Sequence, residues 1–253
     1  FGGTYNGLPN GSYCDAAFYS SQWNKPFSTG IGGFTLLNDT SLIDTLNNVN
    51  KDLQIPSRKQ QKVLGVLIRL KKFMLHDSTY WTLLRLYRSW SKSGAVVGSS
   101  SESELISTKM PADYFMGSST VQQKVGLQNI KSIEELIALR KKNGLIYNQF
   151  LRENNKWNYP GEVLQNHSFL KFPIFAKDRA VFIKKAEKSK VRLGDWFISP
   201  IHPVTENFEL WNLTIDDYPE SKKFSQQILN LPTDIKNSDK VISFLNANLK
   251  DLI

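Results

Sequence analysis

The sequence is poor in the residues that build disulfides and metal centres. Its 253 residues include one cysteine, Cys14, and three histidines. A single cysteine excludes a disulfide within the chain and is typical of a reducing compartment, so we expect a cytoplasmic location. Cysteine and histidine do not cluster, which leaves a metal site without support. No apolar run is long enough to cross a bilayer.

Acidic residues are also in the minority. The 32 lysines and arginines outnumber the 23 acidic residues and give a formal charge of +9. This balance permits binding to nucleic acid, anionic lipid or anionic small molecules, and it does not choose between them. Because the basic residues are spread along helices without a recognisable motif, we expect no nucleic-acid partner. The hydrophobic content of 40% is sufficient for a globular core.

One lysine, Lys25, lies between an apolar stretch and a glycine-rich turn. The segment from Tyr19 to Gly33 reads YSSQWNKPFSTGIGG. We predict a buried strand over Ala16–Tyr19 and a second strand over Gly33–Leu37, because both are apolar and bounded by turn residues. The glycines after Lys25 allow backbone angles that other residues avoid. Lys25 is therefore expected on a loop held between two strands, where a partly desolvated amine can attack an aldehyde.

The remaining sequence predicts mostly helices. Apolar spacing indicates helices from Ser41 towards Pro56, over 57–75, from Ser78 to Trp90, from Ser119 towards Glu153 with a break near Ser132 or Asn143, over Arg179–Lys188, from Pro219, and over Asp239–Leu252. Strands are predicted over Phe169–Phe175 and Val191–Phe197. The serine-rich segment Gly94–Ser103 is a candidate linker or mobile loop. The order of elements after this linker is typical of a small α/β domain.

Two of these helices, over 57–75 and 78–90, are both basic and rich in apolar residues. They could lie on a membrane surface, where apolar side chains insert and lysines meet anionic headgroups. Alternatively, they pack on a protein core, which the width of the apolar face favours. A weak peripheral membrane contact stays open.

Four blocks of sequence, in order along the chain, carry a resemblance to a known family. They are FGGTYNG from Phe1; DAAFYS from Asp15, followed by Lys25 and STGIGG; QQKVGL from Gln122; and SPIHP from Ser199 with YPE from Tyr218 and LNLP from Leu229. Together they resemble the DegT/DnrJ/EryC1/StrS aminotransferases, which use pyridoxal phosphate and mostly make amino sugars on nucleotide carriers.

The resemblance implies an α/β fold, the C-terminal part of a fold-type-I pyridoxal-phosphate-dependent transferase. Residues 1–110 would end the cofactor-binding large domain and include a helical insertion. Residues 111–253 would form an interface helix and a small C-terminal α/β domain. The family places the acidic partner of the pyridine nitrogen, a ring-stacking aromatic residue and a phosphate-binding turn upstream of the block at Phe1. We therefore expect this chain to be a fragment, a trimmed product or half of a split gene, and the complete protein to be a homodimer.

The same resemblance assigns roles to individual residues. Lys25 would hold pyridoxal phosphate as a Schiff base, the internal aldimine, and then move a proton between substrate and cofactor. Ser20 matches the position whose hydroxyl binds the cofactor phosphate, although a serine at a strand end can simply cap the turn. Asn24 is a candidate wall of the cofactor site. His202 resembles a histidine near the sugar substrate, although a histidine beside proline is also a common structural residue.

The implied reaction is amino transfer from an amino acid such as glutamate to a keto-sugar nucleotide. Relatives that dehydrate the sugar have histidine in place of the lysine, so Lys25 favours amino transfer. Two departures weaken the transfer of family properties: Ile31 stands where glutamate is frequent, and FMG from Phe115 stands where many members have Asn-Tyr-Arg. The alternative is a non-catalytic or truncated member that serves as a partner-binding or membrane-binding subunit. The sequence does not identify the sugar, the amino donor or the regiochemistry.

Overall fold

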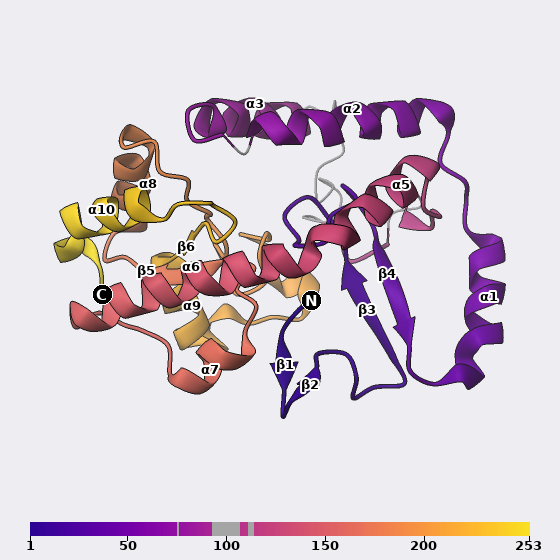
Figure 1. Cartoon of the computed structure of the whole chain (residues 1–253), viewed down its shortest axis with the longest axis horizontal. Coiled ribbons are helices and arrows are strands. Elements are labelled where there is room, and N and C mark those ends of the chain that lie inside the picture. Colours follow the sequence, from indigo (N-terminus) through magenta and orange to yellow (C-terminus); the bar gives the residue numbers. More distant parts are fainter. Residues whose placement is uncertain (75, 93–106, 111–113) are drawn as a thin grey trace. The chain divides into compact units, whose positions relative to one another are not determined.

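The computed structural model describes residues 1–74, 76–92, 107–110 and 114–253 (Figure 1). The candidate linker Gly94–Ser103 lies outside these residues. The chain divides into two compact units. Unit 1 comprises Phe1–Phe73, Pro111–Ala138 and Gln165–Ser168, and unit 2 comprises Met74–Met110, Leu139–Leu164 and Phe169–Ile253.

Unit 1 contains two small antiparallel sheets. Strand β1 (Thr4–Tyr5) pairs with β2 (Leu8–Pro9), and β3 (Ala16–Ser20) pairs with β4 (Gly33–Leu37). The two strands predicted around Lys25 are thus confirmed.

The expected burial of the first of these strands is wrong. Phe18, in the middle of β3, is 90% exposed. Successive side chains of a strand face opposite sides of a sheet, so burial alternates along β3, and only Ala17 and Tyr19 are partly buried. The apolar composition of the strand did not reveal this alternation.

The helices of unit 1 begin after Asp39, whose carboxylate accepts a hydrogen bond from the backbone N–H of Ser41 at 2.8 Å. They are the short η1 (Thr40–Leu42), α1 (Ile43–Asp52), α2 (Arg58–Met74), α5 (Thr120–Asn129) and η3 (Ile130–Ser132), followed by α6 (Ile133–Glu153), which continues into unit 2.

The predicted break in the long helical stretch occurs at Ser132, where η3 separates α5 from α6. The alternative position, Asn143, lies inside α6. Its side-chain amide donates to the backbone carbonyls of Thr233 and Ile235 at 2.9 and 2.7 Å. Asn143 therefore does not compete for the helix backbone, which is the usual way that asparagine weakens a helix.

Unit 2 contains an antiparallel pair of strands, β5 (Phe172–Phe175) and β6 (Ile228–Leu231), in which Phe172 is opposite Leu231. Its other elements are α3 (Tyr80–Lys92), α7 (Gly161–Asn166), α8 (Arg179–Lys188), η4 (Phe208–Trp211), η5 (Ile215–Asp217), α9 (Pro219–Gln227), α10 (Asp239–Ala247) and η6 (Leu249–Asp251). The predicted helix over Arg179–Lys188 and the helix start at Pro219 are confirmed.

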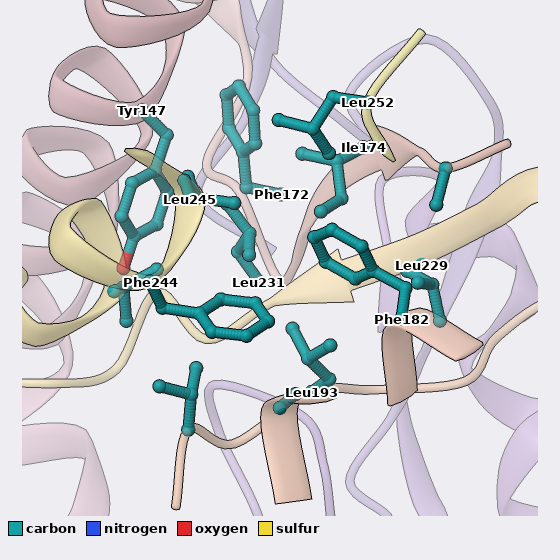
Figure 2. Packing of buried hydrophobic residues seen from close by; sticks show 14 of the residues in the cluster. Tyr147, Phe172, Ile174, Phe182, Leu193, Leu229, Leu231, Phe244, Leu245 and Leu252 are labelled. Carbon is teal, nitrogen blue, oxygen red and sulfur yellow. The ribbon is translucent and has the colours of Figure 1, made fainter. Parts of the chain in front are cut away.

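The core of unit 2 lies between this strand pair and the helices around it (Figure 2). Phe172, Leu229 and Leu231 from the strands are fully buried, and they share one cluster with Tyr147 of α6 and Leu245 of α10. Each such side chain contributes about 1.5–3 kcal/mol through removal from water. This unit therefore has a hydrophobic core of its own.

The predicted strand over Val191–Phe197 is wrong. The segment forms a single bridge, between Gly194 and Asn230. Trp81 Nε1 donates to the carbonyl of Val191, and the Tyr80 hydroxyl donates to that of Leu193, both at 3.1 Å. On the side of β6, the antiparallel register would set Arg192 opposite Pro232, which has no N–H to donate, so the pairing does not extend beyond Gly194 in that direction.

Candidate functional site

The loop that carries Lys25 is closed at its base by hydrogen bonds. The backbone N–H of Ser21 donates to Gly32, and that of Thr29 donates to Ser21, each at 2.9 Å. The hydroxyls of Ser21 and Thr29 are 2.7 Å apart and buried. Within the loop, the N–H of Lys25 donates to the carbonyl of Gln22 at 3.0 Å and forms a turn. The lysine is thus presented on a short loop with a fixed base.

The glycines after Lys25 are required by the backbone. Gly30 and Gly32 have φ angles of +98° and +85°, which L-residues with side chains rarely adopt. A Cβ atom at Gly30 would also lie 2.9 Å from Cδ1 of Leu64 and 3.2 Å from the Trp23 ring. The predicted role of the glycine-rich turn is confirmed at these two positions.

Side chains from two helices of unit 1 hold the far side of the same loop. Gln122 Nε2 of α5 donates to the carbonyl of Ile31 at 2.9 Å, and Asn129 Nδ2 donates to the carbonyl of Ser28 at 2.6 Å. Lys71 Nζ of α2 donates to the hydroxyl of Ser28 at 3.2 Å. The loop position therefore depends on polar contacts with α2 and α5.

Gln122 has a second role at the start of α5. Its Oε1 accepts from the backbone N–H of Ser119 at 2.8 Å, while the Ser119 hydroxyl accepts from the backbone N–H of Gln122 at 3.3 Å. This is a capping box, and a serine three residues before a glutamine is its sequence signal. That signal could have identified Gln122 as a fixed side chain. Lys71 and Asn129 had no local signal, because their partner Ser28 is 43 and 101 residues away.

Three of the predicted site residues lie on this one hairpin. Lys25 is half-buried, Asn24 is exposed, and Ser20 is the exposed last residue of β3. The Ser20 hydroxyl accepts a hydrogen bond from the N–H of Gln22 at 3.4 Å. Ser21, in contrast, is only 2% exposed. Of the two adjacent serines, Ser20 is the one whose hydroxyl faces solvent.

The ring of Phe1 lies against the Lys25 hairpin. The Phe1 ring contacts Tyr19 and Phe34 edge-on, with centroids 5.8 and 6.3 Å apart. The segment at Phe1 and the Lys25 hairpin therefore form one local site in unit 1.

His202 belongs to unit 2. Its Nδ1 accepts a hydrogen bond from the backbone N–H of Ile198 at 3.3 Å, and its ring packs edge-on to Phe197 with centroids 5.5 Å apart. Burial lowers the pKa of His202, Arg179 lowers it further, and Asp195 partly opposes both. The ring is thus neutral at physiological pH, with the proton on Nε2.

Unit 2 also holds a partly buried group of opposite charges. Asp234 lies 3.8 Å from the guanidinium nitrogens of both Arg140 and Arg192. Burial alone would raise the pKa of Asp234, but Lys171, Arg192 and Arg140 together bring it below its ordinary value. Asp77 pairs with Arg192 Nε at 3.2 Å. The sequence did not indicate this group.

In the part of the chain that the structure describes, histidine, cysteine and carboxylate side chains form no group that could hold a metal ion. Among the described helices, none has the length and apolar character needed to span a membrane. No curated protein matches the sequence significantly.

Solved structures of sugar-modifying enzymes resemble the chain in fold. The putative sugar aminotransferase Spr1654 from Streptococcus pneumoniae, in its PMP form, has a TM-score of 0.63 at 16% identity, over 98% of this chain and 55% of that protein. PseC from Helicobacter pylori, an aminotransferase of pseudoaminic acid biosynthesis, has a TM-score of 0.61 at 16% identity, over 99% and 56%. A variant of the dehydratase ColD with bound GDP-perosamine has 0.59 at 14%, over 98% and 58%.

These likenesses confirm the predicted α/β class as part of a fold-type-I transferase. The chain spans about half the length of the solved structures that it matches. The sequence profile of the DegT/DnrJ/EryC1/StrS aminotransferase family matches residues 95–245, which is more than half of the chain. The chain therefore belongs to the DegT/DnrJ/EryC1/StrS aminotransferase family.

Proposed function

We propose that the protein is a pyridoxal-phosphate-dependent aminotransferase and that Lys25 is its cofactor-binding lysine. The observation that carries the proposal is the placement of Lys25 on the loop between β3 and β4, whose base is closed by hydrogen bonds between Ser21, Thr29 and Gly32. Family membership supplies the chemistry for which such a lysine is suited. A fixed loop would keep the Lys25 amine close to both the cofactor and the substrate during the reaction.

The residues present fit the part of a pyridoxal phosphate site that this hairpin would supply. Lys25 offers an amine for the cofactor aldehyde, and the exposed Ser20 hydroxyl is a donor for its phosphate. Asn24, exposed beside Lys25, is the candidate side wall. When bound, the cofactor supplies an electron sink for the bonds at the substrate α-carbon. Lys25 Nζ then accepts the α-proton and returns it as a general acid.

The finer assignments rest on the resemblance. We propose glutamate or a similar amino acid as donor, a keto-sugar nucleotide as acceptor, and His202 as a residue near that sugar. The fold match to ColD, a dehydratase, shows that fold alone does not choose between amino transfer and dehydration. Lys25 favours amino transfer, because a lysine would supply the primary amine that holds the cofactor aldehyde and moves a proton.

The organisation of the complete protein is likewise a proposal. Residues 1–110 would end the cofactor-binding domain, and 111–253 would supply the interface helix and the C-terminal domain. The complete enzyme would be a cytoplasmic homodimer. Because the chain spans about half the length of the matching structures, other contacts to cofactor and substrate would come from outside it.

The first test is covalent trapping of the cofactor. The chain is incubated with pyridoxal phosphate, reduced with borohydride and digested, and the modified peptides are located by mass spectrometry. We expect one label per chain, on Lys25. Lys25→Arg should abolish this label, whereas Lys51→Arg, an exposed lysine of α1, should leave it unchanged. Labels scattered over many lysines, or a label that survives Lys25→Arg, would contradict the assignment.

The second test is turnover by the complete protein. Lys25→Ala should abolish amination of keto-sugar nucleotides, because the proton-transferring amine is lost. Retained turnover would refute the role of Lys25. Specific labelling of Lys25 without turnover of any nucleotide sugar would favour the non-catalytic alternative.

A further inference from the structure

Helix α2 has two faces of different character. Its inner face packs within unit 1: Cδ1 of Leu64 lies against Gly30, Lys71 reaches Ser28, and Gly65 faces Val121 of α5. Leu64 is 7% exposed. This inner face makes the contacts with the protein core that the wide apolar pattern of the sequence favoured. It does not account for the remaining apolar residues of the helix.

The outer face of α2 carries apolar side chains that stay in water. Val63, Val66 and Leu70 are 42%, 53% and 47% exposed. At 3.6 residues per turn they align along one stripe, and three exposed cations flank them within an arc of roughly 120°. We call this set the outer face; it consists of Lys59, Lys62, Val63, Val66, Arg69 and Leu70.

The charge of α2 is of one sign. Its sequence, RKQQKVLGVLIRLKKFM, contains lysine and arginine but neither aspartate nor glutamate. The helix also lies outside residues 95–245, which the family profile matches. Its composition is therefore a feature of this chain beyond the matched part of the family.

We propose that the outer face of α2 binds the surface of an anionic membrane. Aliphatic side chains between lysines and arginines are what an interfacial helix needs, because the former enter the acyl boundary and the latter meet lipid phosphates. A second copy of this face fits poorly, since two faces without acidic residues repel each other. The phosphates of a nucleic acid would bind the lysines and the arginine, but a nucleic acid would give the exposed aliphatic side chains no apolar partner.

The proposal links membrane binding to the candidate site. The same helix touches the Lys25 loop through Leu64 and Lys71, so a bilayer bound on its outer side would hold that loop within one helix diameter, about 10–12 Å, of the headgroups. Membrane binding by α2 does not require the proposed amino transfer, because the exposed residues and the charge of the outer face are the same whether or not Lys25 is catalytic.

The test is co-sedimentation of the chain with phosphatidylserine-containing vesicles and with phosphatidylcholine vesicles. We expect binding to the anionic vesicles only. The variant Lys59→Gln/Lys62→Gln/Arg69→Gln should bind about 100-fold more weakly. Val66→Ser/Leu70→Ser should also weaken binding, by about tenfold or more. A matched control, Lys184→Gln/Lys188→Gln/Lys223→Gln, removes the same charge from exposed positions of unit 2 and should bind as the parent does.

Equal losses in the control and α2 charge variants would overturn the proposal, because net charge alone would then explain binding. So would an absence of binding, or binding to duplex DNA in preference to vesicles. Dimer formation that Val66→Ser/Leu70→Ser abolishes would assign the face to a second copy. Circular dichroism establishes that each variant folds.

A second measurement tests directly whether α2 is the helix that contacts the vesicle. In a Cys14→Ser background, an environment-sensitive dye on Val66→Cys should shift to the blue with anionic vesicles, while the dye on Lys223→Cys should not. No shift at position 66, with sedimentation retained, would contradict the assignment to α2.

Discussion

The buried hydrophobic side chains are divided unequally between the two units. Among the described residues, only Leu64 and Ile133 of this set lie in unit 1, while the others lie in unit 2. Unit 1 instead exposes large apolar side chains, such as Phe18 at 90% and Leu36 at 47%, and fixes its lysine loop with hydrogen bonds. Hydrophobic burial thus stabilises unit 2, whereas polar anchoring organises the candidate site.

The largest effect should come from matched truncations of phenylalanine in the two units. Phe172→Ala in the core of unit 2 should cost about 3–5 kcal/mol of unfolding free energy, because it removes a fully buried ring and leaves a cavity. Phe18→Ala in β3 should change stability by less than about 0.5 kcal/mol. Urea unfolding followed by tryptophan fluorescence measures both. Similar costs for the two variants would show that Phe18 is covered in solution.

The second prediction concerns the charges of unit 2. Asp234→Asn should cost about 3 kcal/mol, because it removes the carboxylate that the buried Arg140 and Arg192 share and leaves Arg192 with Asp77 alone. The lowered pKa of Asp234 means that its stabilisation is present above the unfolded value of about 3.9 and is lost as the pH falls below it. The parent should therefore lose stability in acid more steeply than the variant. The control is Asp216→Asn, in a pair whose carboxylate is 77% exposed; equal effects of the two variants would contradict the role of Asp234.

A third change addresses the polar anchoring of unit 1. Gln122→Ala removes the Gln122 half of the capping box of α5 and the bond to Ile31, at a local cost of about 1–2 kcal/mol, while the Ser119 hydroxyl keeps its bond to the backbone N–H of residue 122. Hydrogen exchange should become faster for amides of the Lys25 loop and the first turn of α5, while β5 and β6 keep their protection. Gln123→Ala, an exposed neighbour, is the control. Uniformly faster exchange in both units would mean that they unfold together.

The smallest effect concerns His202. Its pKa should lie below the ordinary value of about 6.5, because burial and Arg179 disfavour the cation. NMR titration of the ring measures this pKa, and Asp195→Asn should lower it further, since Asp195 favours the protonated form. The lowered value also means that folding stability falls as the pH drops through about 6.5. A pKa above that value would contradict the described packing.

Local patterns predicted the elements whose cause is local. The glycines after Lys25 and the apolar runs on either side gave both strands of the hairpin, and Arg179–Lys188 was predicted with its observed bounds. The same patterns failed at Val191–Phe197, because strand pairing depends on a distant partner, and Pro232 would stand opposite Arg192 without an N–H to donate. The outward direction of Phe18 was missed for the same kind of reason, since burial depends on what covers a strand.

The candidate site likewise has features that local sequence predicted and features that it did not. The position of Lys25 followed from its own neighbourhood and from a family resemblance. The contacts of Lys71 and Asn129 with Ser28 did not, because they require the tertiary fold to bring α2 and α5 to the loop. The loop position of this one residue was predictable, whereas its support by other elements was not, and the chemistry of Lys25 stays a prediction.

The double role of Gln122 has a consequence for the order of folding. One side-chain amide caps α5 and also holds the carbonyl of Ile31, which lies 91 residues earlier in the chain. The capping box of α5 and the base of the Lys25 loop can each form locally, whereas the bond between Gln122 and Ile31 requires closure over this separation, which costs more chain entropy than a local contact. During synthesis, the Lys25 loop emerges well before α5, so this bond can form only after α5 has left the ribosome.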